Sequence, residues 1–238
     1  MSAPVFGPLS PELQYVRYGF AVVRLFEAAE VEQLERFAEE WISKCISEQI
    51  KRRVERPLHS YHLWHEDEGI LHATLCTAVN RHTIPPADVA AVLLNRRVWN
   101  FLSLVWSGRF RIWDEGLGWL GFRLIRPGSG DGYPPSRKEW GPAKRVISCW
   151  IPIIGRSSAE TLALVPGSHL REYEKYMPSD DKFRKDEFRL VNPKGDEFVR
   201  PNLEIGDAIF YHPRLIHSED VYESEVTRLS LEMRFDPI

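Results

Sequence analysis

The sequence predicts an α+β fold that is mainly β, with helices first and strands after them. Apolar residues recur at helical spacing only before Gly108, and after it short runs rich in branched and aromatic residues alternate with turn residues. A chain of 238 residues that is 43% hydrophobic can bury one sizeable core. This order of elements favours helices packed against a β-barrel or double sheet.

The first part of the chain predicts one strand and two helices. Residues 18–26 form an apolar opening strand, and residues 29–50 carry apolar side chains at three- and four-residue steps, which is typical of an amphipathic helix. A Pro-Pro pair opens a second helix over residues 85–106. Between the helices, the histidine-rich residues 57–69 predict a loop.

The second part predicts a series of strands. They are expected at Arg109–Trp113, Trp119–Ile125, Arg145–Ile154, Glu160–Val165, Asn202–Leu203, Ala208–Tyr211 and Thr227–Phe235. The polar insertion 171–200 has many charges and little periodicity, and we expect a lid or surface excursion there. We therefore expect one domain over residues 1–238, in which residues 1–107 supply a strand and a helical buttress and residues 108–238 supply the core.

Composition excludes several classes of function. A formal net charge of -3 provides no general basic field for nucleic acid. No apolar run approaches the roughly 20 residues that span a bilayer, and the first residues lack the pattern of a signal peptide, so we expect a cytoplasmic protein with no membrane partner. The three cysteines, Cys45, Cys76 and Cys149, are far apart and predict reduced thiols.

The last third carries residue types suited to a metal and a carboxylate. A strand-like run ends on His217, and Arg228 follows eleven positions later with Ser230 beyond it. Strand alternation puts Arg228 and Ser230 on one face, where they can bind a carboxylate, the arginine bidentately. The structural alternatives are a salt bridge from Arg228, for example to Glu232, and a bond from His217 to a nearby carbonyl.

Four stretches of this region resemble the phytanoyl-CoA dioxygenase (PhyH) family of Fe(II)/2-oxoglutarate oxygenases. They are Gly121–Gly128, Cys149–Ile153, Leu162–His169 and Gly206–His217. Their Pro-Gly-Ser-His sequence, Pro166–His169, is the most specific piece. The resemblance implies a double-stranded β-helix (jelly-roll, cupin-like) core and an oxidoreductase acting on a small metabolite or biosynthetic intermediate, with 2-oxoglutarate and Fe(II) as cofactors.

The metal motif of the family is substituted in this sequence. The family has a His-x-Asp motif after the first stretch, commonly followed two residues later by Trp. Here Trp140 is in register, but Ser136 stands at the histidine position and Lys138 at the aspartate position. By the resemblance, His217 corresponds to the distal metal ligand and Arg228 to the cosubstrate arginine.

Other residues could complete the metal site. Glu139 or Asp131 could supply the carboxylate, and His212 or His169 a second imidazole. Strand alternation favours a structural role for His212, and a turn-capping role is the alternative for His169. The tripeptide His65–Asp67 has His-x-Asp spacing, but it lies before the second predicted helix.

Three functions remain open at this point. The first is an oxidoreductase in which Arg228 and Ser230 anchor 2-oxoglutarate and His217 holds iron with unexpected partners. The second is a metal-free enzyme that uses Lys138, Glu139 and His217 as acid-base groups. The third is a ligand-binding barrel without catalysis.

A substrate pocket is expected above the barrel mouth. His59, His62 and His65 form a histidine cluster that, with Trp64, could line it, together with Tyr133 and Trp140. These aromatic residues suit a planar or sugar-like ligand. The alternative for the histidine cluster is a solvated polar loop.

Overall fold

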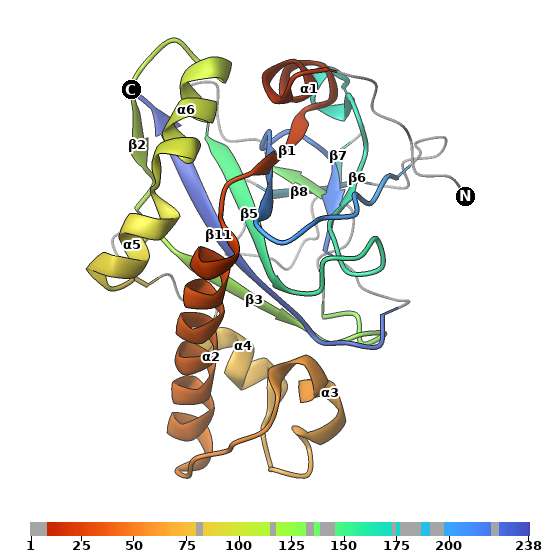
Figure 1. Cartoon of the computed structure of the whole chain (residues 1–238). Helices are drawn as coiled ribbons and strands as arrows, with labels where there is room; N and C mark the ends of the chain where they lie inside the picture. The colour runs from red at the N-terminus through yellow and green to blue at the C-terminus, as the bar shows by residue number, and fades with distance from the viewer. Residues whose placement is uncertain are drawn as a thin grey trace.

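Two largely antiparallel sheets are packed together in this protein, and helices cover one side of the larger sheet (Figure 1). The computed structural model describes residues 9–79, 83–114, 118–131, 136–138, 146–172, 175–176, 187–190, 198–219 and 224–238, with the backbone alone for 136–138, 175–176 and 187–190. The expected α+β, mainly β class is confirmed. Within these ranges, no helix has both the length and the apolar character that crossing a bilayer requires.

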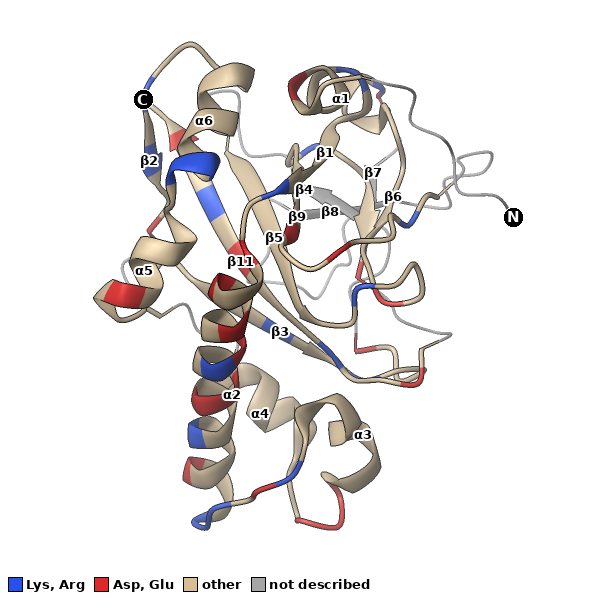
Figure 2. Ribbon diagram, in the orientation of Figure 1, with Lys and Arg blue, Asp and Glu red and all other residues tan. Residues whose placement is uncertain are grey.

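The helices come from the first half of the described chain, apart from one short turn. They are α1 (Pro11–Tyr18), α2 (Ala28–Ile50), η1 (Leu58–Ser60), α3 (Tyr61–Trp64), α4 (His72–Val79), α5 (Ala87–Leu93), α6 (Arg96–Val105) and the later turn η2 (Ser168–Leu170). The predicted amphipathic helix is confirmed as α2, which buries Leu34, Ala38 and Ile42 at helical spacing. Figure 2 shows acidic and basic residues spaced along its exposed positions.

Two helical expectations were wrong. The predicted loop 57–69 contains η1 and α3, because Tyr61 and Trp64 turn inward and are buried. The predicted helix 85–106 is two helices, which separate at Asn95. The side chain of Asn95 accepts hydrogen bonds from the main-chain N–H groups of Arg97 and Val98, at 2.8 and 3.4 Å, and so begins α6.

The larger sheet has six strands. In order they are β1 (Phe20–Arg24), β9 (Asp207–Tyr211), β5 (Ile147–Ile154), β11 (Arg228–Pro237) and β2 (Phe110–Ile112), with β3 (Gly121–Ile125) also paired to β11. The opening strand of the sequence therefore pairs with β9 near the other end of the chain, with Phe20 opposite Tyr211. In β3, Arg123 lies opposite Ser230 and Ile125 opposite Arg228.

The smaller sheet has five short strands. In order they are β6 (Ala163–Leu164), β10 (His217–Ser218), β4 (Ser136–Lys138), β8 (Glu187–Leu190) and β7 (Lys175–Tyr176). The expectation for the insertion 171–200 needs correction, because β7 and β8 belong to this sheet. The alternating sequence of Glu187–Leu190 suits a strand with one solvated face. The strand expected at residues 202–203 is not present.

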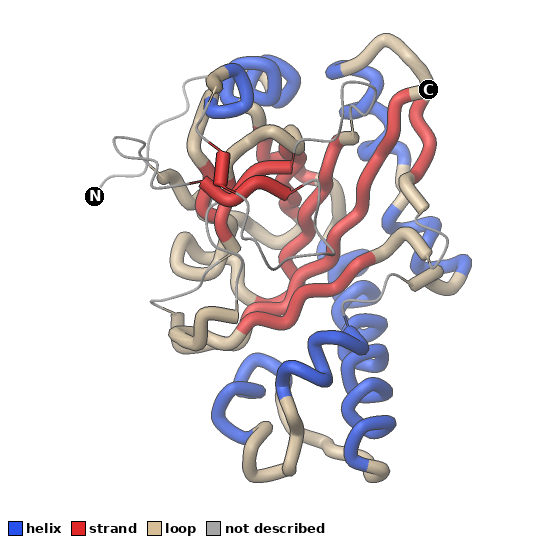
Figure 3. The backbone as a smooth tube through the Cα atoms, turned by 180° about the vertical axis from the view of Figure 1, so that it is seen from behind, coloured by secondary structure: helices blue, strands red, loops and turns tan. Residues whose placement is uncertain are grey.

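The two faces of β11 meet different layers. Leu229, Leu231, Met233 and Phe235 pack in one core with residues of α2 and α6. Arg228, Ser230, Glu232 and Arg234 alternate with them, and all four are buried. Figure 3 shows the helices and the smaller sheet on opposite sides of the larger sheet. A second core joins the larger sheet to β6, so the polar face of β11, which alternates with its helix-facing residues, lies toward the smaller sheet.

Candidate functional site

Arg228 begins β11 and is completely buried. Its Nη1 donates to the carbonyl oxygen of Glu160 at 3.3 Å. Its Cζ lies 5.6 Å from the ring centroid of Trp150, which is within the range of a cation–π contact. The acid considered as a structural partner, Glu232, forms an ion pair with Arg234 at 3.0 Å. These contacts place the guanidinium of Arg228 inside the protein. This group stays charged at any physiological pH.

Two buried donors share the face of the larger sheet that carries Arg228. Ser230 Oγ and Trp150 Nε1 have no hydrogen-bond partner among the described residues, and the residues are 0% and 1% exposed. Ser230 pairs with Pro152 and Glu232 pairs with Trp150, so β5 and β11 direct these side chains to one face. A buried donor without an acceptor costs about 1–3 kcal/mol. An acceptor-rich group such as a carboxylate would satisfy both.

A buried ionic network continues along the same face. Tyr211 donates its hydroxyl to Glu232 at 3.2 Å. Arg123 lies 3.8 Å from both Glu219 and Glu232. Burial raises the pKa of the Tyr211 hydroxyl well above its ordinary value, so it acts as a neutral donor. The sequence reasoning missed Glu219, although its position two residues after His217 was the available signal.

His217 is buried at the strand position expected for the distal ligand. Its Nδ1 donates to the carbonyl oxygen of Leu215 at 2.9 Å, and its ring lies 4.9 Å from the ring of Tyr211. On the backbone, His217 pairs directly with Ser136 of β4. Directly paired residues point to the same face of a sheet and are about 4.5–5.5 Å apart. The structure therefore brings the substituted histidine position next to His217.

Several predicted site residues lie outside what the structure describes. Tyr133, Glu139 and Trp140 are outside the described residues, and Ser136 and Lys138 are described by backbone only. By strand alternation, Lys138 is on the same side of β4 as Ser136.

The donor set does not fit an iron site of two imidazoles and one carboxylate. Among the described residues, no three His, Cys, Asp or Glu side chains are arranged to hold a metal ion. His217 in β10 and Glu219 directly after that strand supply one imidazole and one carboxylate. A serine and a lysine at the His-x-Asp position supply neither ligand type. The part of the chain that the structure describes therefore supplies two of the three usual ligands.

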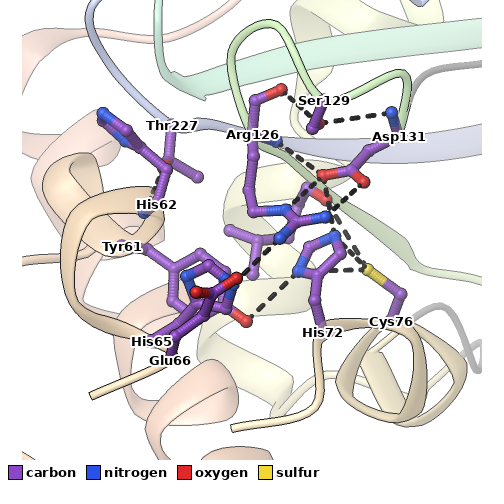
Figure 4. A network of polar contacts seen from close by, with 11 residues as sticks. Tyr61, His62, His65, Glu66, His72, Cys76, Arg126, Ser129, Asp131 and Thr227 are labelled. Carbon is purple, nitrogen blue, oxygen red and sulfur yellow. Dashed lines mark hydrogen bonds and ion pairs between the residues drawn. The ribbon is translucent and has the colours of Figure 1, made fainter. Parts of the chain in front are cut away.

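Asp131 is not available as the missing carboxylate. Arg126 donates to it from Nε at 2.8 Å and from Nη2 at 2.9 Å, and His72 Nε2 lies 2.9 Å away (Figure 4). Burial is the largest influence on the pKa of Asp131 and raises it, but the hydrogen bonds from Arg126 and His72 hold it well below its ordinary value. This corrects the expectation that Asp131 could turn toward the metal position.

His169 and His212 also have other partners. Their rings lie 5.3 Å apart, and His169 Nε2 donates to the carbonyl oxygen of Val16 at 3.2 Å. His212 Nδ1 accepts from the main-chain N–H of Arg214 at 3.1 Å. Burial lowers the pKa of His212 to about 4. These are the contacts of structural histidines, so neither serves as a second imidazole.

His65 lies in the polar network of Figure 4. It is 4% exposed, and its Nε2 accepts from Arg126 Nη1 at 2.9 Å. Arg126 and Asp131 line a cavity of about 270 Å3 between α4 and β3. The tripeptide His65–Asp67 is therefore not a metal site, because its histidine is bound to a guanidinium and Asp67 is exposed.

The sequence reasoning also missed the pair His72 and Cys76 on α4. Their four-residue spacing on one helix face was the signal, and Cys76 Sγ lies 3.1 Å from His72 Nε2. Burial raises the pKa of the Cys76 thiol to about 11, so it stays protonated near neutral pH. The pair therefore does not form an activated nucleophile.

The sequence of this chain is similar to that of one known family. The model of the phytanoyl-CoA dioxygenase (PhyH) family matches residues 127–224, which confirms the resemblance expected from the sequence. No curated protein matches by sequence comparison.

Solved structures support the same architecture. AviO1 from Streptomyces viridochromogenes Tue57 is 15% identical with a TM-score of 0.60, over 95% of this chain and 93% of that chain. The epimerase SnoN, in complex with Fe3+, alpha ketoglutarate and nogalamycin RO, is 15% identical with a TM-score of 0.59, over 95% of this chain and 82% of that chain. The non-heme monooxygenase ThoJ, as a Ni complex, is 12% identical with a TM-score of 0.58, over 96% and 77%. At these identities the likeness establishes the fold.

Proposed function

We propose that this protein is a PhyH-like oxidoreductase of the dioxygenase type, which binds 2-oxoglutarate or a closely related oxo acid at Arg228 and acts on a small metabolite or biosynthetic intermediate. The observation that carries the proposal is the buried Arg228 beside the unsatisfied donors of Ser230 and Trp150. In this proposal the two sheets are the halves of a double-stranded β-helix.

The residues of the site suit the far carboxylate of the oxo acid. A guanidinium binds a carboxylate through two parallel hydrogen bonds, and these bonds are stronger in a site that excludes water. Ser230 and Trp150 would each donate one further bond, which removes the cost of burying them unsatisfied. His217 is held by its bond to Leu215, which fixes the ring orientation and tautomer.

Binding of 2-oxoglutarate, followed by calorimetry, tests the proposal. The wild type is expected to bind 2-oxoglutarate, and Arg228→Gln is expected to weaken binding by roughly tenfold or more, because a charge-assisted bond is lost. Arg24→Gln is the matched control, since Arg24 pairs with Glu204 and Asp207 on the surface. Equal affinity in the wild type and Arg228→Gln would overturn the proposal.

Iron dependence is tested separately. We propose that it is altered, because Ser136 and Lys138 replace the usual ligands. Elemental analysis after anaerobic reconstitution with equimolar iron, together with succinate formation in the presence and absence of a chelator, distinguishes the outcomes. Iron at one equivalent in the wild type would show that the donor set is completed by residues outside the described ranges.

A second candidate function is metal-free acid-base chemistry by Lys138, Glu139 and His217. The observation in its favour is the pairing of Ser136 with His217, which sets β4, and with it Lys138, beside the histidine strand. Turnover should then survive a chelator and be lost in Lys138→Ala. If a ligand raises the melting temperature and no product forms, the protein is a ligand-binding barrel instead.

A further inference from the structure

The segment that carries the histidine cluster contacts the residue before Arg228. We call residues 57–79 the histidine lobe; it contains η1, α3 and α4. The main-chain N–H of the buried Thr227 donates to the carbonyl oxygen of His59 at 2.7 Å. The hydroxyl of Thr227 accepts from the main-chain N–H of His62 at 3.1 Å and lies 2.9 Å from His62 Nδ1 (Figure 4).

The direction of the bond between these side chains depends on the tautomer of His62. Thr227 Oγ accepts from the main-chain N–H of His62, and its own hydrogen can be donated to His62 Nδ1 when that nitrogen carries no proton. That bond requires a neutral His62 ring with its proton on Nε2. Burial lowers the pKa of His62, with smaller contributions from His65 and His59, and this favours the neutral form.

The lobe also binds the end of the neighbouring strand. His65 accepts from Arg126, which directly follows β3, and Ile125 of β3 is the register partner of Arg228. The histidine lobe is therefore bonded both next to the start of β11 and next to the end of β3, the two strand ends beside Arg228. Of these bonds, the one between His62 and Thr227 is adjacent to Arg228.

We propose that His62 is a positioning residue for Arg228, acting through the hydroxyl of Thr227. The inference rests on the proposed role of Arg228 as the carboxylate-binding residue. A strand end is free to shift unless its backbone and side chains are bonded, and a bidentate bond to a carboxylate tolerates little displacement. Loss of the His62 bond would therefore weaken carboxylate binding without removing a group that touches the ligand.

The test compares three variants for 2-oxoglutarate affinity by calorimetry and for amide hydrogen exchange at residues 227–231. His62→Ala is expected to weaken binding roughly three- to tenfold and to speed exchange at residues 227–231. His62→Asn is expected to restore both, because Asn Oδ1 occupies the place of Nδ1 and accepts the same bond. His59→Ala is the control, since His59 bonds Thr227 through its main-chain carbonyl, which the substitution keeps, and its side chain is exposed.

The pH profile separates this role from simple packing. In the wild type, affinity should fall as the pH drops below the ordinary histidine value of 6.5, because protonation turns Nδ1 into a donor and deprives the Thr227 hydrogen of this acceptor. In the His62→Asn variant, this decrease in 2-oxoglutarate affinity at low pH should be absent. His65, whose pKa burial also lowers, stays in both proteins, so its contribution cancels in the comparison.

The other possible results also support or contradict the positioning role of His62. If the wild type does not bind 2-oxoglutarate, the proposed function fails, but exchange at residues 227–231 still tests the positioning role. Unchanged affinity and exchange in His62→Ala would overturn the inference. Failure of His62→Asn to restore a weakened site would also overturn it and assign His62 to packing. If His62→Ala does not fold, His62→Asn and the pH profile carry the test.

Discussion

Ser136 lies directly opposite His217 in the smaller sheet. This pairing gives structural meaning to the substituted metal motif, because residues paired across antiparallel strands project side by side on one face. A histidine at position 136 would lie next to His217, and residue 138 follows on the same side of β4. The pairing therefore places position 136 beside His217, and the sequence has a serine there.

Restoring the two ligand types should restore iron binding. The double variant Ser136→His/Lys138→Asp is expected to bind about one equivalent of Fe(II) after anaerobic reconstitution, because it supplies the missing imidazole and carboxylate beside His217. Elemental analysis measures the gain over the wild type. Arg137→His is the matched control, since alternation directs residue 137 to the opposite face. If the double variant contained no more iron than the wild type, the pairing of position 136 with His217 would not be sufficient to form an iron site.

Ser230→Ala should separate ligand binding from stability. Removing a buried hydroxyl that has no partner is expected to leave the free energy of unfolding unchanged or to raise it by about 1 kcal/mol, because no hydrogen bond of the described chain is lost. The affinity for 2-oxoglutarate should fall roughly three- to tenfold in the same variant. Urea unfolding and calorimetry measure the two effects. Ser103→Ala, which removes an exposed hydroxyl bonded to Trp99, should leave the affinity unchanged. A large loss of stability in Ser230→Ala would indicate a structural hydroxyl.

Stability should decrease as the pH falls below 6.5. The pKa of His212 is lowered to about 4 by burial, so the folded state binds fewer protons than the unfolded state between those values. The contribution is fully present above the unfolded-state pKa and is lost between about pH 6.5 and pH 4, at an expected total of about 3 kcal/mol. Replacing His212 by Gln should flatten this part of the stability profile in urea unfolding. His59→Ala should keep the wild-type slope, and an equal slope in both variants would contradict the assignment.

Asp131→Asn should destabilise the protein without changing its metal content. The substitution removes the charge that binds Arg126 and His72, and it leaves a guanidinium that is partly buried without its counter-ion. The expected loss is about 2–4 kcal/mol in urea unfolding, with the lower end favoured because Arg126 is not fully buried. Glu66→Gln, which alters an exposed side chain of the same lobe, is the control. If Asp131→Asn lowered the iron content and left the stability unchanged, Asp131 would be a metal ligand and the prediction would be wrong.

Local sequence patterns predicted much of the larger sheet and part of the site. The helical spacing in residues 29–50 predicted α2, and alternation in the last strand put Arg228 and Ser230 on one face. The resemblance aligned Ser136 with the histidine of the family motif, and the structure pairs Ser136 with His217. These features depend on periods of a few residues, which a single sequence displays directly.

The short elements and the paired charges needed the tertiary structure. β4, β8 and β10 are two to four residues long, and so short a segment forms a strand only when its neighbours supply the hydrogen bonds. The sequence offered Asp131 as a possible metal ligand, and only the structure shows Arg126 bonded to both Asp131 and His65.

The sequence by itself determined the fold class, the resemblance to the PhyH family, and the presence of Ser136 and Lys138 at the positions that align with the His-x-Asp motif of that family. Only the tertiary structure decided which side chains are available to the site and which are already bonded. The physical reason is distance along the chain, since His62 and Thr227 are separated by 165 positions and meet only when the lobe packs on β11. The type of a residue indicates what chemistry its side chain can perform. The contacts of that side chain in the folded protein decide whether it can also bind a ligand.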